Sequence, residues 1–161
     1  MGFPLLSESP LFLYNIGTED DRRWSQIYRK YNANPLGKQV GDCTVRAISK
    51  ALGLPWEEVY IGLIFEGFLM CDMPSANRVW GAYLKRRGWI REPIPDTCPD
   101  CYTVADFCRD HPRGVYILAI DGHVVCVENG HWCDTWDSGN EIPIYFWKRK
   151  ENEVCTEITT E

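Results

Sequence analysis

The feature that most constrains the fold is the pair Asn129-Gly130, which separates two segments of alternating apolar and polar residues. An Asn-Gly pair in this setting is typical of a two-residue β-hairpin turn, because both residues tolerate the positive φ angles that the turn requires. We therefore expect antiparallel strands over 123–128 and 131–136. A turn of fixed length also fixes the register, so the residues that face one another across the hairpin can be assigned from the sequence.

The predicted register brings a histidine and an aspartate to the same face of the hairpin. Counting outward from the turn, Cys126 faces Cys133, which leaves Asp134 diagonally beside His123. Diagonal neighbours lie roughly 7 to 8 Å apart at the backbone, within reach of their side chains. Trp136 faces His123 across the hairpin and is expected to shield the His–Asp pair from water.

Helical periodicity dominates the chain before Gly114, and strand-like patterns follow it. Three prolines between Glu92 and Cys101 predict a surface loop. The high apolar content of the second well-defined helix predicts that it is mostly buried. The expected helices run over 19–31, from Cys43 or Thr44 to Leu52, from Pro55 to about Leu69, from Ser75 to Arg87 and from Thr103 to Asp110, and the expected strands over 115–120, 123–128, 131–136 and 142–148.

This order of elements predicts an α+β fold, in which an N-terminal helical part packs on a C-terminal antiparallel sheet. A chain of 161 residues with 45% hydrophobic content is typical of one compact domain. We expect an N-terminal arm with a possible short helix over 1–31, the folded domain over 32–150 and a C-terminal tail over 151–161.

Composition and charge exclude several classes of function. A net charge of −6 argues against nucleic acid as the main partner, because binding to phosphates needs a concentrated basic face. We see neither a targeting segment nor an apolar run of the roughly 18 residues that a spanning helix needs, so we expect no membrane partner and a cytoplasmic location. The eight cysteines are then expected to be reduced thiols. The oligomeric state stays open.

Cys43 is the candidate nucleophile among these thiols. It lies where a helix should begin, directly after Gly41-Asp42. Unpaired backbone N–H groups and the helix dipole stabilise a thiolate at such a position. The alternative is a cysteine used as a small buried apolar residue at a helix start. His123 is the candidate base, with a purely structural histidine as its alternative, and Asp134 could orient the imidazole.

Cys98-Pro99-Asp100-Cys101 is a competing motif. It could be half of a zinc site, although a second pair at matching spacing is missing and Cys108 and His111 are only loose candidates for further ligands. A redox pair would require a preceding strand and a helix that begins at the motif. We favour structural or loop cysteines, and we expect no metal and no cofactor.

Two short motifs together carry a family resemblance. The segment from Gly41 to Ala51 (GDCTVRAISKA), followed by Gly122-His123-Val124-Val125 and by Asp134-Thr135-Trp136-Asp137-Ser138, resembles the papain-like cysteine peptidase-like proteins of bacteria and their phages. The resemblance runs from about residue 32 to 147. It implies a helical lobe that bears the cysteine against a sheet that bears the histidine, with Cys43 as nucleophile, His123 as general base and Asp134 as the third member.

The segment before Cys43 departs from the pattern of that family. Papain-like peptidases usually carry a Gln or Asn oxyanion donor about six residues before the cysteine, where this chain has Gly37. Gln39 is the likelier donor, together with the backbone N–H of Cys43, and Asn34 lies farther upstream. Two functions therefore remain open. One is a thiol-dependent hydrolase that cleaves a peptide, isopeptide or amide bond of a peptide or protein substrate, and the other is an inactive papain-like module that binds or inhibits through an aromatic groove.

Overall fold

The protein is described by a computed structural model over residues 27–95 and 99–150. The fold is α+β, with four helices and a six-stranded sheet in this part of the chain. The helices are α2 (Cys43–Leu52), α3 (Trp56–Met70), α4 (Asn77–Lys85) and α5 (Val104–Asp110). The strands are β1 (Tyr28–Lys30), β2 (Trp89–Pro93), β3 (Val115–Ile120), β4 (His123–Glu128), β5 (His131–Asp134) and β6 (Pro143–Arg149).

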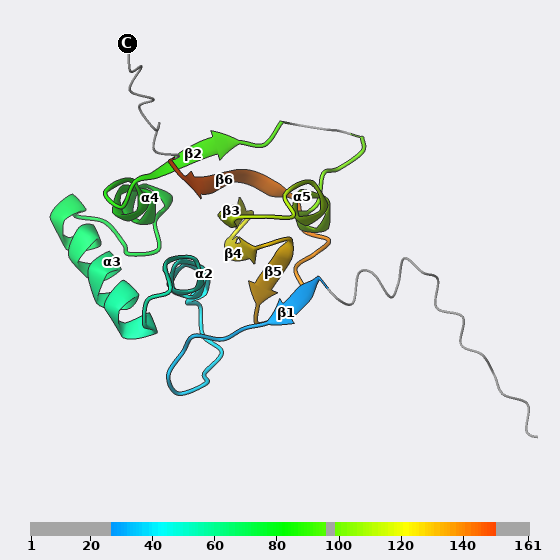
Figure 1. Cartoon of the computed structure of the whole chain (residues 1–161). Coiled ribbons are helices and arrows are strands. Elements are labelled where there is room, and N and C mark those ends of the chain that lie inside the picture. Colours follow the sequence, from blue (N-terminus) through cyan, green and yellow to red (C-terminus); the bar gives the residue numbers. More distant parts are fainter. Residues whose placement is uncertain (1–26, 96–98, 151–161) are drawn as a thin grey trace, which may run out of the picture.

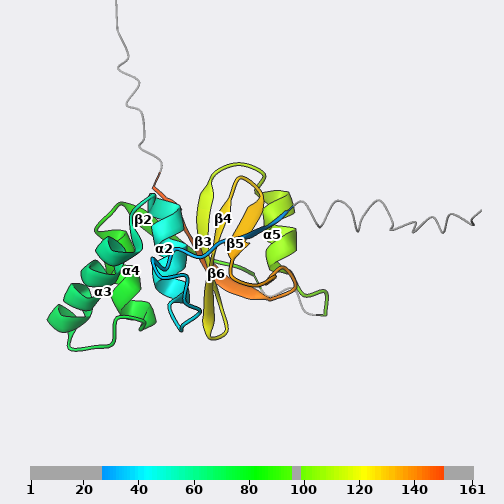
Figure 2. The ribbon, with the colours of Figure 1, turned by 90° about the horizontal axis from the view of Figure 1, so that it is seen from below.

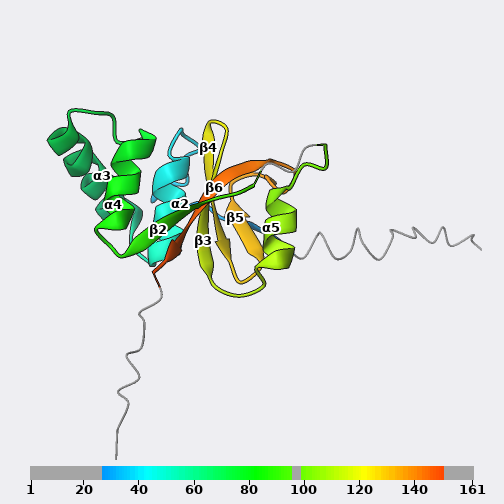
Figure 3. The same ribbon diagram turned by 90° about the horizontal axis from the view of Figure 1, so that it is seen from above.

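The sheet has the order β1-β5-β4-β3-β6-β2 and separates two layers of helix. Helices α2, α3 and α4 lie on one side, where α2 is the helix next to the sheet, and α5 lies on the other side (Figure 1). Views of the molecule from below and from above show the same division (Figures 2 and 3). Each side has its own apolar core, with Ile48 and Trp80 in the larger one and Phe107 and Leu118 in the smaller.

The central hairpin forms with the predicted register. Asn129 and Gly130 have φ values of 51° and 75°, the left-handed conformations that this turn needs. Cys126 pairs with Cys133 across strands β4 and β5, as predicted. Strand β5 ends at Asp134, two residues earlier than expected. Strand β4 begins at His123 and strand β5 ends at Asp134, so the two residues lie at the same end of the hairpin.

The expected antiparallel sheet is wrong at one edge. Strand β1 pairs in parallel with β5, so the sheet is mixed, while the other four pairings are antiparallel. The short helix expected over 19–31 lies partly outside the described residues, and Tyr28–Lys30 within that range form strand β1 instead of helix. The predicted loop from Glu92 is also too long, because β2 continues to Pro93 at the opposite edge.

The outer helices differ from the prediction in two respects. Ala76, not Ser75, occupies the N-cap position of α4. The expectation that α3 is mostly buried is wrong, because Ile61, Phe65 and Phe68 are 65%, 61% and 77% exposed. The helix buries mainly Val59 and Leu63 against its neighbours and turns its remaining apolar side chains outward.

The helix lengths also bear on the expected absence of membrane segments. Within residues 27–95 and 99–150, no helix has both the length and the apolar character to cross a bilayer. The N-terminal residues 1–26 and the predicted tail over 151–161 lie outside the described residues.

Candidate active site

Helix α2 places Cys43 at its first position. Asp42 is the N-cap residue, but its side chain makes no capping hydrogen bond to the helix. The first backbone N–H groups of α2 are therefore left without a capping carboxylate, and their partial positive charge acts on the thiol of Cys43. Gly53 ends the helix in a left-handed conformation, with its N–H bonded to the Ser49 carbonyl.

The start of β4 brings His123 to this thiol. Hydrogen bonding from the imidazole and from the backbone N–H of Val124 lowers the pKa of the Cys43 thiol, which places both groups beside the sulfur. The other side of the ring contacts Asp134, with 2.5 Å between His123 Nε2 and Asp134 Oδ2. Because Nε2 is directed at the aspartate, Nδ1 is the nitrogen that faces the thiol.

The three groups shift one another's pKa values toward the charged forms. Burial raises the pKa of the Cys43 thiol. The hydrogen bonding from His123 and Val124 lowers this pKa by more than burial raises it, so the pKa lies below its ordinary value. Burial lowers the pKa of His123, while the hydrogen bonds with Asp134 and Cys43 raise it to about 9. The imidazole is therefore protonated at neutral pH and can donate from both nitrogens.

Asp134 is a buried carboxylate, and both of its oxygens have hydrogen-bond partners. Besides His123, Oδ2 accepts a hydrogen bond from the Ser138 hydroxyl at 3.0 Å, and Oδ1 accepts one from the Thr135 backbone N–H at 2.7 Å. Burial raises the pKa of Asp134, but the hydrogen bond from His123 and these further donors lower it below its ordinary value. The carboxylate stays ionised and holds the imidazole in one orientation.

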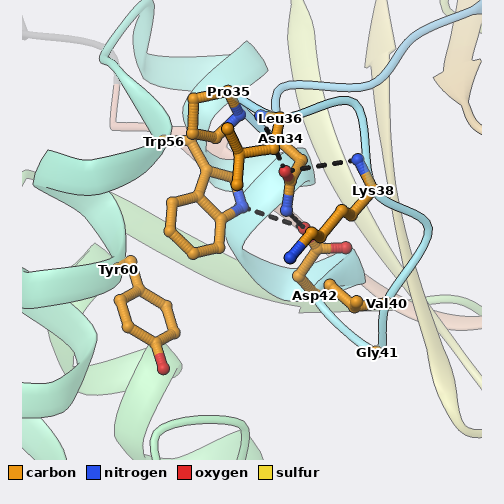
Figure 4. Close-up of a pocket in the computed structure, with 9 residues that line it drawn as sticks. All are labelled: Asn34, Pro35, Leu36, Lys38, Val40, Gly41, Asp42, Trp56 and Tyr60. Atoms are coloured by element: carbon orange, nitrogen blue, oxygen red, sulfur yellow. Dashed lines mark hydrogen bonds between the residues drawn. The ribbon is translucent and has the colours of Figure 1, made fainter.

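Arg46 links the base side of the site to the residue before the cysteine. Its side chain is only 7% exposed, pairs with the carboxylate of Asp42 and lies 3.6 Å from Asp134 Oδ1. Asp42 also accepts a hydrogen bond from Trp56 Nε1 at 2.9 Å (Figure 4). A buried guanidinium thus pairs with two buried carboxylates, Asp42 beside the cysteine and Asp134 beside the histidine.

Trp136 lies beside the imidazole, as the hairpin geometry suggested. The centroids of the His123 and Trp136 rings are 5.3 Å apart at an interplanar angle of 45°. The indole is itself 44% exposed. The side chain of His123 is only 15% exposed.

The predicted oxyanion donors lie in the loop that precedes Cys43. Gln39 is exposed in this loop. The amide nitrogen of Asn34 is 3.4 Å from Asp42 Oδ2, so this donor is already directed at a carboxylate. The backbone N–H of Cys43, at the first position of α2, has no partner within the helix ladder and is the donor that the helix geometry itself supplies.

The other cysteines of the described chain occupy different surroundings. Cys126 and Cys133 are free thiols that face each other in the sheet, and burial raises the pKa of both. Burial also raises the pKa of Cys108 to about 12. Cys98, the first cysteine of the Cys-x-x-Cys motif, lies outside the described residues, while Cys101 is exposed.

The proposed further zinc ligands have other contacts in the structure. The ring of His111 stacks on Phe107 at a centroid distance of 3.9 Å, and its Nδ1 is 3.0 Å from the Phe107 carbonyl. Among the described residues, no group of three His, Cys, Asp or Glu side chains is placed to hold a metal ion. His111 therefore packs as a half-buried ring against aromatic side chains of the smaller core.

Sequence reasoning missed the polar partners that surround the three predicted residues. Arg46 and Ser138 lie within the segments that carried the family resemblance, but neither was assigned a role. The Asp42 to Arg46 spacing of four residues on a helix is a signal that could have indicated their ion pair. No local signal indicates that Arg46 also reaches Asp134.

Comparisons of the chain with protein-family models, with curated proteins and with solved structures found no match. The fold class is therefore given by the architecture alone, as an α+β domain with a mixed sheet between two helical layers.

Proposed function

We propose that this protein is a thiol-dependent hydrolase with a papain-like arrangement, in which Cys43, His123 and Asp134 cleave a peptide, isopeptide or amide bond. The observation that carries the proposal is the continuous chain of contacts from the Cys43 thiol through the His123 ring to the buried Asp134 carboxylate. A cysteine at a helix start, a histidine at a strand start and an orienting acid are the parts that nucleophilic thiol catalysis requires.

In the proposed reaction the Cys43 thiolate attacks the carbonyl carbon and forms a C–S bond. The tetrahedral oxyanion is stabilised by the Cys43 backbone N–H, with Gln39 as the proposed second donor. His123 donates its Nδ1 proton to the leaving amine as the C–N bond breaks. Water then transfers a proton to the same nitrogen and attacks the thioester. The C–S bond breaks, which releases the acid and restores the Cys43 thiolate beside the protonated imidazole.

Asp134 supports both halves of this cycle without contacting the substrate. Its carboxylate accepts the Nε2–H of His123, which keeps Nδ1 directed at the thiol. The same negative charge stabilises the protonated imidazole that protonates the amine. Asp134 is therefore proposed as a positioning residue, and Ser138 and Arg46 hold it in place.

The first test measures the reactivity of each thiol in the native protein. Limiting iodoacetamide at pH 6.5, followed by peptide mass spectrometry, should alkylate Cys43 at least about tenfold faster than exposed Cys71, because His123 and the start of α2 stabilise the Cys43 thiolate. His123→Ala should abolish the difference, while His131→Ala, at the turn of the same hairpin, should leave it unchanged. Equal rates at Cys43 and Cys71 in the wild-type protein would sink the proposal.

The second test measures turnover. A mixture of proteome-derived peptides is incubated with the protein, and new termini are counted by mass spectrometry. Cleavage should depend on Cys43 and be lost in Cys43→Ala. The exposed position of Gln39 and the engagement of Asn34 by Asp42 favour a second candidate, a papain-like binding module without turnover. A fast-labelling Cys43 with no cleavage of any peptide would favour that module over the hydrolase.

A further inference from the structure

A pocket lies directly upstream of Cys43, between the loop that precedes the cysteine and the start of α3. It has a volume of about 410 Å³, and Gly41 and Asp42 are among the residues that line it. The loop from Asn34 to Gly41 forms one side, and Trp56 and Tyr60 form the other (Figure 4). Asp42, which lines the pocket, is the residue directly before the proposed nucleophile.

The walls of the pocket are largely apolar. The rings of Trp56 and Tyr60 stack at a centroid distance of 4.6 Å and an interplanar angle of 12°, which gives an aromatic surface that spans one turn of α3. Across from them, Leu36 and Val40 are 74% and 50% exposed. Apolar side chains that the fold leaves open around a concave site are typical of ligand pockets.

The charged group at the floor of the pocket is already neutralised. The Asp42 carboxylate pairs with the buried guanidinium of Arg46 and also accepts the indole N–H of Trp56. A cationic ligand group would have to compete with both of these partners. Lys38 is the other charged residue that lines the pocket, and it is exposed on the loop. The largely apolar walls therefore favour an apolar occupant over a cationic one.

Hydrogen bonds hold the two walls in place. The Trp56 indole is fixed by its 2.9 Å bond to Asp42. On the loop side, the side-chain oxygen of Asn34 accepts hydrogen bonds from the backbone N–H groups of Leu36 and Lys38 at 3.1 and 3.3 Å. A pocket whose walls are fixed in this way loses little conformational entropy when a ligand binds.

We propose that this pocket is a specificity site, which receives one aromatic or long aliphatic side chain of the substrate next to the bond that is cleaved. The proposal rests on the proposed function and extends it by naming the class of substrate, a peptide with a large apolar residue beside the scissile bond. The volume is at the lower end of the range of ligand pockets and suits a single large side chain. Tyr60 and Leu36 are then specificity residues that contact the substrate.

A series of iodoacetamides that differ only in the N-substituent tests this proposal. The full-length protein is treated with the N-methyl, N-hexyl, N-benzyl and N-carboxyethyl reagents, and the rate at Cys43 is divided by the rate of each reagent with free N-acetylcysteine. We expect the normalised rates of the benzyl and hexyl reagents to exceed that of the methyl reagent by about tenfold or more, because a buried apolar group of this size contributes that much to binding.

Variants assign the preference to the pocket. Tyr60→Ala and Leu36→Ser, both at exposed side chains, should each reduce the benzyl-to-methyl ratio at least about threefold. Tyr60→Phe keeps the stacked ring and should retain the ratio. Phe68→Ala, on the same helix but away from the pocket, is the matched control and should also retain it.

The outcomes separate this proposal from the proposed function. If the N-methyl reagent labels Cys43 no faster than Cys71, the proposed function fails. If Cys43 is labelled selectively but at a rate independent of the N-substituent, or if Tyr60→Ala retains the benzyl preference, the specificity site is overturned and the reactive cysteine stands. A preference for the N-carboxyethyl reagent would instead indicate an anion site at Lys38 and would also overturn the apolar assignment.

Discussion

Helices α2 and α3 follow each other in the chain, yet they differ in how much of each helix is buried. Helix α2 buries a threonine, a serine and an arginine, and Arg46 is only 6% exposed. Helix α3 is far more apolar, yet its outer face exposes phenylalanine and isoleucine side chains, with Phe68 77% exposed. Burial in this protein therefore follows the position of a helix in the layers more closely than its composition.

The layers explain the contrast. Helix α2 lies between the sheet and α3, so nearly all of its side chains meet protein (Figure 1). Its buried polar groups are tolerated because they are paired, as Arg46 is with Asp42 and Asp134. Helix α3 is the outer layer and has protein on one side only. The fold thus concentrates buried charge at the candidate active site and leaves apolar surface at the periphery.

The largest expected effect tests the buried charge of α2. Arg46→Met leaves the Asp42 and Asp134 carboxylates buried without their guanidinium, which should lower the free energy of unfolding by about 3–5 kcal/mol. Urea denaturation at pH 7 measures this change. Arg78→Met is the matched control, since the Arg78 side chain is 65% exposed in its pair with Asp72 and its loss should cost at most about 1 kcal/mol. Similar losses in the two variants would contradict the contrast between buried and exposed charge.

The second prediction concerns the pH dependence that the site imposes on stability. The pKa of His123 is raised from 6.5 to about 9, so its contribution is fully present below pH 6.5 and is lost as the pH rises through about 9. The pKa of Asp134 is lowered, so its contribution is present above pH 3.8 and is lost as the pH falls through its lower folded value. Asp134→Asn removes the main cause of the raised His123 pKa and should flatten the decline between pH 6.5 and 9.

NMR titration of the His123 imidazole gives a direct readout of this prediction. The midpoint should lie near 9 in the wild-type protein and should move down by at least about one pH unit in Asp134→Asn, because the hydrogen bond and the charge of Asp134 are both removed. Asp121→Asn, in the exposed turn between β3 and β4, should leave the midpoint in place. An unchanged midpoint in Asp134→Asn would show that Asp134 does not set the charge state of the imidazole.

Local signals in the sequence were enough to predict the elements that carry the three central site residues. Helix α2 begins at Cys43 and ends at Leu52, as predicted. The recurrence of apolar positions at helical spacing indicated the helix, and Gly53 and Pro55 marked its end. The Asn129-Gly130 turn fixed the register that sets Asp134 beside His123. The structure brings these three side chains into contact, while their catalytic roles remain proposals.

The features that sequence reasoning missed depend on contacts between distant parts of the chain. Strand β1 has three residues and exists because it pairs with β5, about a hundred residues later, for which no local pattern gives a signal. The burial of Arg46 needs Asp134 on the sheet as well as Asp42 on its own helix. The exposure of α3 was missed for a related reason, because apolar composition predicts burial only where another layer covers the helix.

A smaller effect is expected where a single hydrogen bond of the network is removed. Ser138→Ala deletes the hydroxyl that donates to Asp134 Oδ2, at a position with no exposed surface. The carboxylate keeps its bonds from His123 and Thr135, so the free energy of unfolding should fall by only about 1 kcal/mol. Urea denaturation measures the change, with Ser75→Ala at an exposed position as the control. A loss as large as that of Arg46→Met would mean that Ser138 is essential to the network.

The smallest effect is expected on the outer face of α3. Phe68→Ser replaces a side chain that is 77% exposed, so little buried apolar surface is lost and the free energy of unfolding should change by no more than about 0.5 kcal/mol. Leu63→Ala on the same helix removes a side chain that is 1% exposed and should cost about 2–5 kcal/mol. Urea denaturation of the two variants at one protein concentration compares the faces directly. A loss of 2 kcal/mol or more for Phe68→Ser would show that this face is covered in solution and would remove the contrast with α2, because α3 would then be an inner helix as well.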